Sequence, residues 1–375
     1  MSEGSRIERV EGRRLALPTG LKDVVLPNGQ RIRADLGVIV VRLTDADGAQ
    51  GYSLVWAQQE RLLVLFEAGL QLLGPQLRGT TPHDGESVVT SLRGHLGFVG
   101  WSGAGAFATS GLEMAVQDLL CRRRGVSLAR ALGKRSDTVR AYQTGLMLGS
   151  APEDLVTEAK AIYAGGVKAI KMIVGKPDLE EDLERIGAVK AALPADATLM
   201  VDALQHWDPA AALRAAEAFA PLGLAWLEDP IGHHDLAGYR ELVVRSPVPI
   251  ATGESLFEEA DFRALVDAGV PYVIAELERV GGISQWMRTA ELVSQGEGVL
   301  LPHIYPHVSA QLIAALNQRE AWWEYVPWFN GLVPGRFELR DGLLVVSDQP
   351  GSGFDPDPDA IERFARADWL DLASG

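Results

Sequence analysis

The sequence has 375 residues, of which 47% are hydrophobic and 23% are charged, and its formal net charge is −15. This length provides for one large or two ordinary domains with an ample core. The excess of acidic residues argues against a nucleic-acid-binding protein and against binding to an anionic membrane surface. Cys121 is the only cysteine, which excludes an intrachain disulfide and a cysteine-based zinc cluster.

No segment reaches the roughly 18 apolar residues that a membrane span requires. The first residues, "MSEGSRIERVEGRR", lack the apolar stretch of a secretory signal. We therefore expect a cytoplasmic protein that has no membrane partner.

The first 50 residues are typical of β-strands. Residues 6–17 and 36–53 are strand-like, and the second segment contains a turn within Asp45–Gly51. The polar stretch between them contains Gly and Pro and predicts a mobile loop. From Gln58 to about Gly133 the pattern becomes helical, and "EMAVQDLLCRRRG" predicts a helix that ends at Gly125. We expect an α+β region over residues 1–135.

Eight short apolar runs follow, each suited to a buried strand. They occupy residues 139–146, 169–174, 198–203, 224–230, 249–254, 272–277, 298–304 and 322–327. Amphipathic stretches such as residues 179–193 and 208–222 separate most of them. Repeated strand–helix units build a parallel sheet, so the series predicts an α/β fold with a (β/α)7β TIM-like barrel over residues 136–345. Residues 346–375 predict a polar loop and a final helix.

Three carboxylates end successive predicted strands. Asp202 ends the third, Glu228 the fourth and Glu254 the fifth, at intervals of 26 residues. The carboxyl ends of barrel strands converge, so these side chains should meet at one mouth. Three like charges repel, and oxygen ligands suit a hard divalent cation such as Mg²⁺, with Mn²⁺ as an alternative.

Four further polar residues continue this pattern. Glu276 ends the sixth strand, His303 ends the seventh and Glu324 lies in the eighth. A carboxylate beside a histidine orients the imidazole and raises its basicity. Lys171, at the end of the second strand, would face this group either as a base or as a charged group that stabilises an anion. Any one of these residues has a simpler role as a helix cap or solvent contact, but packing hardly explains the whole series.

On these residues the chain resembles the enolase superfamily, and specifically its mandelate racemase subgroup. The metal ligands of that family match Asp202 in "VDALQHW", Glu228 in "WLEDP" and Glu254 in "ATGES". "RVGGI" and "LPHIYPH" match the regions after the sixth strand and at the seventh, and "WWEYVP" supplies Glu324.

The resemblance implies one Mg²⁺ per active site, a small-molecule carboxylate as substrate and abstraction of the proton α to that carboxylate. It implies that residues 1–135 form a capping domain, which residues 346–375 complete, and that a loop around Pro18–Asn28 closes the site. Relatives are usually homo-oligomers, so a homo-oligomer is expected.

Two departures from the family pattern decide the predicted reaction. The second strand usually reads Lys-x-Lys, but this chain has Ile173 in place of the second lysine. The partner of the histidine is usually Asp, and here it is Glu276. A racemase needs a base on both faces of the α-carbon, whereas a dehydratase can work from one face. We therefore expect dehydration of an acid sugar to a 2-keto-3-deoxy acid, with His303 as the base.

An epimerase, racemase or cycloisomerase is the alternative, and a non-catalytic barrel protein is a remote one. Three further residues are expected near the substrate. These are Trp56, Tyr142 at the end of the first barrel strand, and His206, for which a solvated loop is an equally good interpretation.

Overall fold

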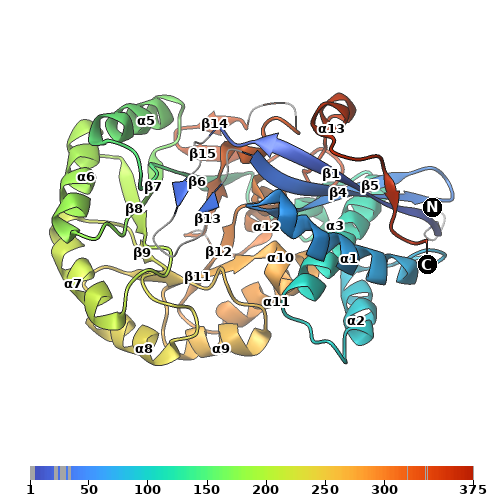
Figure 1. Ribbon diagram of the computed structural model, residues 1–375, viewed down its shortest axis with the longest axis horizontal. Coiled ribbons are helices and arrows are strands. Elements are labelled where there is room, and N and C mark those ends of the chain that lie inside the picture. The colour runs from blue at the N-terminus through green and yellow to red at the C-terminus, as the bar shows by residue number, and fades with distance from the viewer. Residues whose placement is uncertain are drawn as a thin grey trace.

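The structure is a computed structural model that describes residues 5–20, 24–25, 31–32, 35–318, 320–333, 335 and 337–374. Its N-terminal region is built on an antiparallel sheet. Strands β1 (Ile7–Pro18), β4 (Asp35–Asp45) and β5 (Gln50–Ala57) lie in that order. The turn predicted between β4 and β5 is present. Because β16 (Leu370–Asp371) pairs with β1, the C-terminal segment returns to this sheet (Figure 1).

Helices cover this sheet, as the sequence predicted. They are α1 (Leu63–Leu73), α2 (Gly85–His95), α3 (Ala104–Arg124) and the short α4 (Leu128–Ala131). Helix α3 ends at Gly125, whose φ of 66° is left-handed and suits glycine. Smaller elements complete the region: β2 (Val24–Val25), β3 (Arg31–Ile32), η1 (Glu60–Leu62) and η2 (Gly74–Gln76).

The larger region is a parallel α/β array, and each of the eight predicted runs contains one of its strands. They are β6 (Thr138–Gly145), β7 (Ala169–Ile173), β8 (Thr198–Asp202), β9 (Leu227–Glu228), β10 (Ile250–Thr252), β11 (Tyr272–Glu276), β12 (Val299–His303) and β13 (Trp322–Tyr325). Strands β6 to β12 pair in chain order, and β13 pairs with the other edge of β6. Every one of these pairings is parallel.

Helices connect these strands and lie outside them (Figure 1). They are α5 (Pro152–Ala164), α6 (Leu179–Ala192), α7 (Pro209–Phe219) with η3 (Ala220–Leu222), α8 (Leu236–Arg245), α9 (Glu259–Asp267), α10 (Leu277–Val280), α11 (Ile283–Val293) and α12 (Pro306–Ala315). After β13 come η4 (Pro327–Phe329), β14 (Leu339–Arg340), β15 (Leu343–Val345) and α13 (Pro358–Phe364). All five residues of β7 are buried, as expected for a strand covered on both faces.

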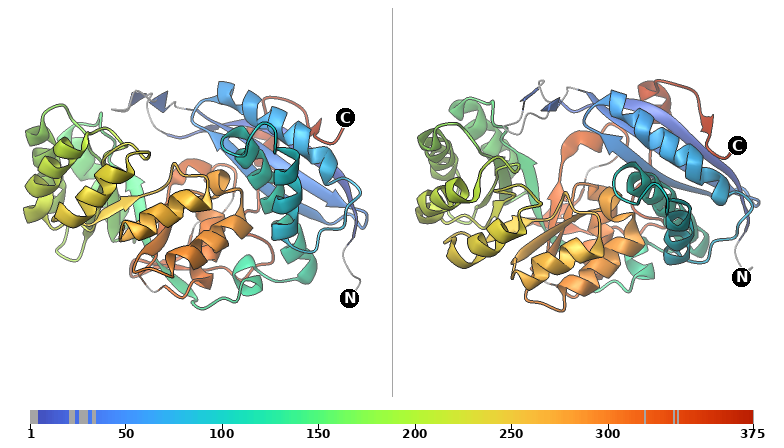
Figure 2. Two further views of the ribbon diagram at one scale, coloured as in Figure 1. Left: turned by 90° about the horizontal axis from the view of Figure 1, so that it is seen from below. Right: turned by 60° about the horizontal axis from the view of Figure 1, so that its bottom comes forward.

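The two regions are joined through α3. Glu113 on α3 is fully buried, and its carboxylate accepts hydrogen bonds from the backbone N–H groups of Ile283 (2.8 Å) and Ser284 (3.0 Å) at the start of α11. Figure 2 shows the N-terminal sheet and its helices beside the part of the array that contains α10 and α11. The boundaries at residues 135 and 345 stay a prediction. In the described part of the chain, no helix is long and apolar enough to cross a bilayer.

Candidate active site

A cavity of about 290 Å³ opens at the carboxyl ends of the parallel strands. Strand ends supply one part of its lining, including Lys171, Asp202, Glu254, Glu276, His303 and Glu324. The N-terminal region supplies another part, including Trp56, Leu62, Phe66 and Phe107. The predicted polar residues therefore share one cavity, which lies between the two regions of the chain.

Lys171 is the central cation of the site. Its side chain is 2% exposed, and its Nζ forms an ion pair with Glu228 and lies 3.1 Å from Glu324 and 3.6 Å from Asp202. Glu324 also accepts hydrogen bonds from the hydroxyl of Thr144 and from the backbone N–H of Ile304. Lys171 was expected at the end of its strand, but it is the third of the five residues of β7. Its Nζ reaches the site from below because the lysine side chain is long.

The pKa values of this cluster show how tightly its charges are coupled. Burial, together with neighbouring carboxylates, raises the pKa of Asp202 to about 7 and that of Glu228 to about 8, although Lys171 opposes the change. Burial also opposes ionisation of Glu324, but Lys171 and His303 outweigh it and lower its pKa to about 2. The carboxylates hold the pKa of Lys171 well above its usual value despite burial, so this lysine is a cation and not a neutral base.

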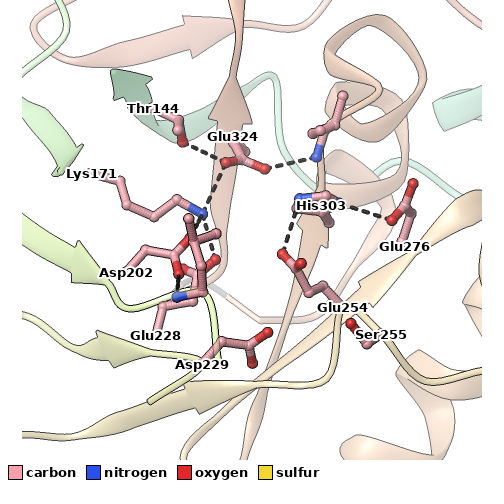
Figure 3. A network of polar contacts seen from close by, with 12 residues as sticks. Thr144, Lys171, Asp202, Glu228, Asp229, Glu254, Ser255, Glu276, His303 and Glu324 are labelled. Atoms are coloured by element: carbon pink, nitrogen blue, oxygen red, sulfur yellow. Dashed lines mark hydrogen bonds and ion pairs between the residues drawn. The ribbon is translucent and has the colours of Figure 1, made fainter. Parts of the chain in front are cut away.

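His303 faces Lys171 across the site (Figure 3). Its Nδ1 lies 3.0 Å from Oε2 of Glu276, and its Nε2 lies 3.0 Å from Oε2 of Glu254. Burial opposes protonation of His303, but Glu254 and Glu276 outweigh it and raise its pKa to about 10. The Arg279 guanidinium binds Glu276 and donates to the backbone carbonyl of Glu254. The longer side chain of glutamate therefore still reaches the histidine.

The three predicted metal ligands lie on adjacent strands. Asp202 and Glu228 end β8 and β9 and are register partners, and Glu254 follows β10 by two residues. In the described residues, no three His, Cys, Asp or Glu side chains are already gathered as a metal-binding group. Lys171 and His303 contact these carboxylates instead. The donor set of three carboxylates fits a hard divalent cation, and the raised pKa values show that the buried charges are incompletely balanced.

A second layer of polar residues supports the carboxylates, and the sequence analysis did not identify it. Asp229, fully buried next to Glu228, accepts hydrogen bonds from Thr252 (2.6 Å) and from Nε2 of Gln205 (3.1 Å). Gln205 also donates to Ser255 (2.9 Å). The signal was present in "WLEDP", where a second acidic residue adjoins the predicted ligand, and in "VDALQHW", where Gln205 follows Asp202 by three residues.

The three expected substrate contacts have different outcomes. Trp56 lines the cavity. His206 is exposed and is not part of the cavity lining, so the solvated-loop interpretation describes it. Tyr142 does not end its strand, because β6 continues to Gly145. Its buried ring packs on Trp226 below the cavity, and Thr144 is the residue of β6 that lines the cavity.

Ile173 lines the cavity on the side of Lys171, so the position of the missing second lysine is occupied by a hydrocarbon side chain. The predicted loop Pro18–Asn28 lies mostly outside the described residues.

Residues 154–360 match the family model described as "Enolase C-terminal domain-like". The chain belongs to the enolase superfamily. Its relatives place it with the mandelate racemase and muconate lactonizing enzymes of that superfamily. The family predicted from the residues is therefore confirmed.

Three relatives of this superfamily member are particularly informative. The L-talarate/galactarate dehydratase of Salmonella typhimurium strain LT2 is 33% identical over 94% of this chain and 89% of its own length. The 3,6-anhydro-alpha-L-galactonate cycloisomerase of Streptomyces coelicolor is 30% identical over 94% of this chain and 97% of its own. The crystal structure of L-talarate dehydratase from Polaromonas sp. JS666, complexed with Mg and L-glucarate, has a TM-score of 0.88, 30% identity and coverage of 98% and 99%.

Proposed function

We propose that this protein dehydrates an acid sugar to a 2-keto-3-deoxy acid in an Mg²⁺-dependent reaction, with His303 as the base. One observation carries the proposal. His303 and Lys171 face each other across the cavity, but only His303 can exchange a proton there, since Lys171 is held as a cation by three carboxylates. The relatives support the proposal, because they include acid sugar dehydratases and one of them is complexed with Mg.

In this proposal Asp202, Glu228 and Glu254 hold the cation. When bound, Mg²⁺ would draw electron density from the substrate carboxylate and make the α-proton acidic enough to remove. Contact of Glu254 with a cation would free Nε2 of His303, which now lies 3.0 Å from that carboxylate. Loss of this contact would also lower the pKa of His303 towards the working range of a base. Lys171 keeps its charge and stabilises negative charge that develops on the substrate carboxylate.

The proposed steps balance as follows. Nε2 of His303 takes the α-proton, and the electrons of the C–H bond form a double bond between C2 and C3. The C3–O bond breaks, and the imidazolium returns its proton to the departing hydroxide, so that water leaves. The remaining enol takes up a proton at C3 and becomes the 2-keto acid. Glu276 holds the Nδ1–H of His303 and so directs Nε2 at the substrate.

The test is incubation of the protein and Mg²⁺ with a library of acid sugars in D₂O, scored for 2-keto acids. We expect a 2-keto acid from at least one of them, no product with His303→Gln, and unchanged turnover with the exposed control His206→Gln. Deuterium at the α-carbon of an inverted product without loss of water would replace dehydration by the epimerase alternative. A ring-opened or ring-closed isomer would indicate a cycloisomerase, the activity named for the Streptomyces coelicolor relative. Turnover that persists in His303→Gln would overturn the assignment of the base.

Two structural features belong to the same proposal. We infer that the parallel strands close into a (β/α)7β barrel, because β12 and β13, at the two ends of the pairing order, are in contact. We also infer a homo-oligomer, which light scattering coupled to size-exclusion chromatography would test. Exposed apolar side chains on α1 and in the loop after α2, such as Leu65 and Phe98, support it.

A further inference from the structure

One wall of the cavity is made of hydrocarbon side chains. Met147, Ile173 and Leu204 pack together with Leu148, and the first three line the cavity. They come from the ends of β6, β7 and β8, on the side of the site that holds Lys171 and away from His303. Met147 and Ile173 are only 8% and 3% exposed.

The backbone that carries this wall is braced from behind. The guanidinium of Arg185 on α6 donates hydrogen bonds to the carbonyl of Ile173 (3.2 Å) and to that of Met147 (3.3 Å). Asp182 pairs with Arg185 and also accepts from the backbone N–H of Gly175 (2.8 Å). All these contacts are buried, so the wall has little freedom to move aside and expose polar groups.

The polar side chains next to the wall already have partners. Gln205 donates to Asp229 and Ser255 and accepts from the backbone N–H of His233. Thr144 donates to Glu324. A substrate hydroxyl placed against the wall would therefore lose its hydrogen bonds to water without replacement there.

The opposite end of the cavity is aromatic. Phe66 and Phe107 stack with their ring centroids 4.5 Å apart, and Trp56 packs edge-on against Trp328 at 5.8 Å. All four line the cavity. Aromatic and aliphatic surfaces thus extend from the reacting centre towards the N-terminal region.

We propose that the substrate is a 2,3-dihydroxy acid whose chain beyond C3 is hydrocarbon, and not a fully hydroxylated acid or a diacid. The proposal rests on the dehydratase function above, which requires hydroxyl groups only at C2 and C3. The α-hydrogen faces His303, the carboxylate lies at Asp202, Glu228 and Glu254, and the apolar chain runs along Met147, Ile173 and Leu204 towards the aromatic end.

The test compares acids of equal carbon number: 2,3-dihydroxyhexanoate, the hexonates with the same C2 and C3 configuration, and the matching hexarate. Binding to the Mg²⁺-loaded protein is measured by calorimetry, so that the result does not depend on turnover. We expect 2,3-dihydroxyhexanoate to bind about a hundredfold more tightly than the hexonate, because an apolar pocket discriminates against added hydroxyl groups by about this factor. Equal or tighter binding of the hexonate or hexarate would overturn the proposal.

Two variants connect this preference to the wall. Leu204→Asn nearly conserves size, and Asn suits the left-handed backbone of this position (φ 50°), so the variant should fold. We expect it to reduce the preference about tenfold, and Met147→Gln to act in the same direction. The control Val244→Asn alters a residue of α8 that is 84% exposed and should leave the preference unchanged. An unchanged preference in both wall variants would contradict the proposed role of the wall. If no acid yields a 2-keto acid but the binding preference holds, the dehydratase function fails and the substrate class stands.

Discussion

Nδ1 of His303 lies 3.0 Å from Oε2 of Glu276, although the family pattern would have an aspartate as the partner. The extra methylene is accommodated because Arg279, one helical turn after Glu276, binds the same carboxylate. The pair therefore keeps the geometry in which a carboxylate fixes the histidine tautomer and directs Nε2 into the cavity.

Glu276→Gln should lower kcat about a hundredfold and change KM little, because the amide can still accept the Nδ1–H but no longer stabilises the imidazolium. Loss of the carboxylate charge should also lower the pKa of His303, which Glu276 helps to raise. The acidic limb of the kcat/KM profile should therefore move to lower pH. Steady-state kinetics across pH test this prediction, with the exposed Glu259→Gln as control. Wild-type kcat and an unmoved profile would show that the pair is not catalytic.

Mg²⁺ should stabilise the folded protein. At a free concentration one hundred times the Kd, binding to the folded state alone adds about 2.7 kcal/mol to the free energy of unfolding. Glu254→Gln and Asp202→Asn should abolish the Mg²⁺-dependent rise in Tm, whereas Glu259→Gln should retain it. Calorimetric scans with and without Mg²⁺ give the comparison, and an undiminished rise in both ligand variants would move the metal site elsewhere.

Lys171→Met should destabilise the metal-free protein by about 3 kcal/mol at pH 8, since it leaves buried carboxylates without their cation. The loss should be smaller at pH 6, because Asp202 and Glu228, whose pKa values are already raised to about 7 and 8, then take up protons. Lys168→Met is the matched control, because Lys168 has a 41% exposed side chain and pairs with Asp196 at the surface. Chemical unfolding at the two pH values measures both variants. A loss no larger than that of the control would contradict this account.

His307 should make stability depend on pH in the acidic range. Its ring packs between Phe337 and Phe354, and burial lowers its pKa from 6.5 to about 4. Between these two values the unfolded chain binds more protons than the folded chain, so stability falls as the pH falls from 6.5 to 4. The contribution is about 2 kcal/mol, and His307→Phe should remove it. Unfolding of both proteins at a series of pH values is the measurement, and parallel curves would disprove the assignment.

Much of the chemistry could be predicted from residue types and their spacing. The eight apolar runs and the repeated interval of 26 residues between Asp202, Glu228 and Glu254 predicted parallel strands with carboxylates at one end. This was possible because strand periodicity and strand–helix alternation are local properties of the chain. His303, Glu276 and Glu324 followed from the same alternation.

Other parts of the site depend on distance in space. The sequence marks Ile173 as an absent lysine, but only the tertiary structure packs it with Met147 and Leu204 as one wall, braced by Arg185. Likewise, local pattern placed Tyr142 and His206 near the substrate, whereas the register of β6 and the exposure of the loop after β8 exclude them from the cavity lining.

The sequence by itself determined the family, the order of the strands and the polar residues at their ends, since these depend on neighbours along the chain. Only the tertiary structure decided which charges pair, that Lys171 is held as a cation, and where the cavity is polar or apolar. These properties arise from burial and from contacts between segments far apart in sequence, which no local pattern encodes.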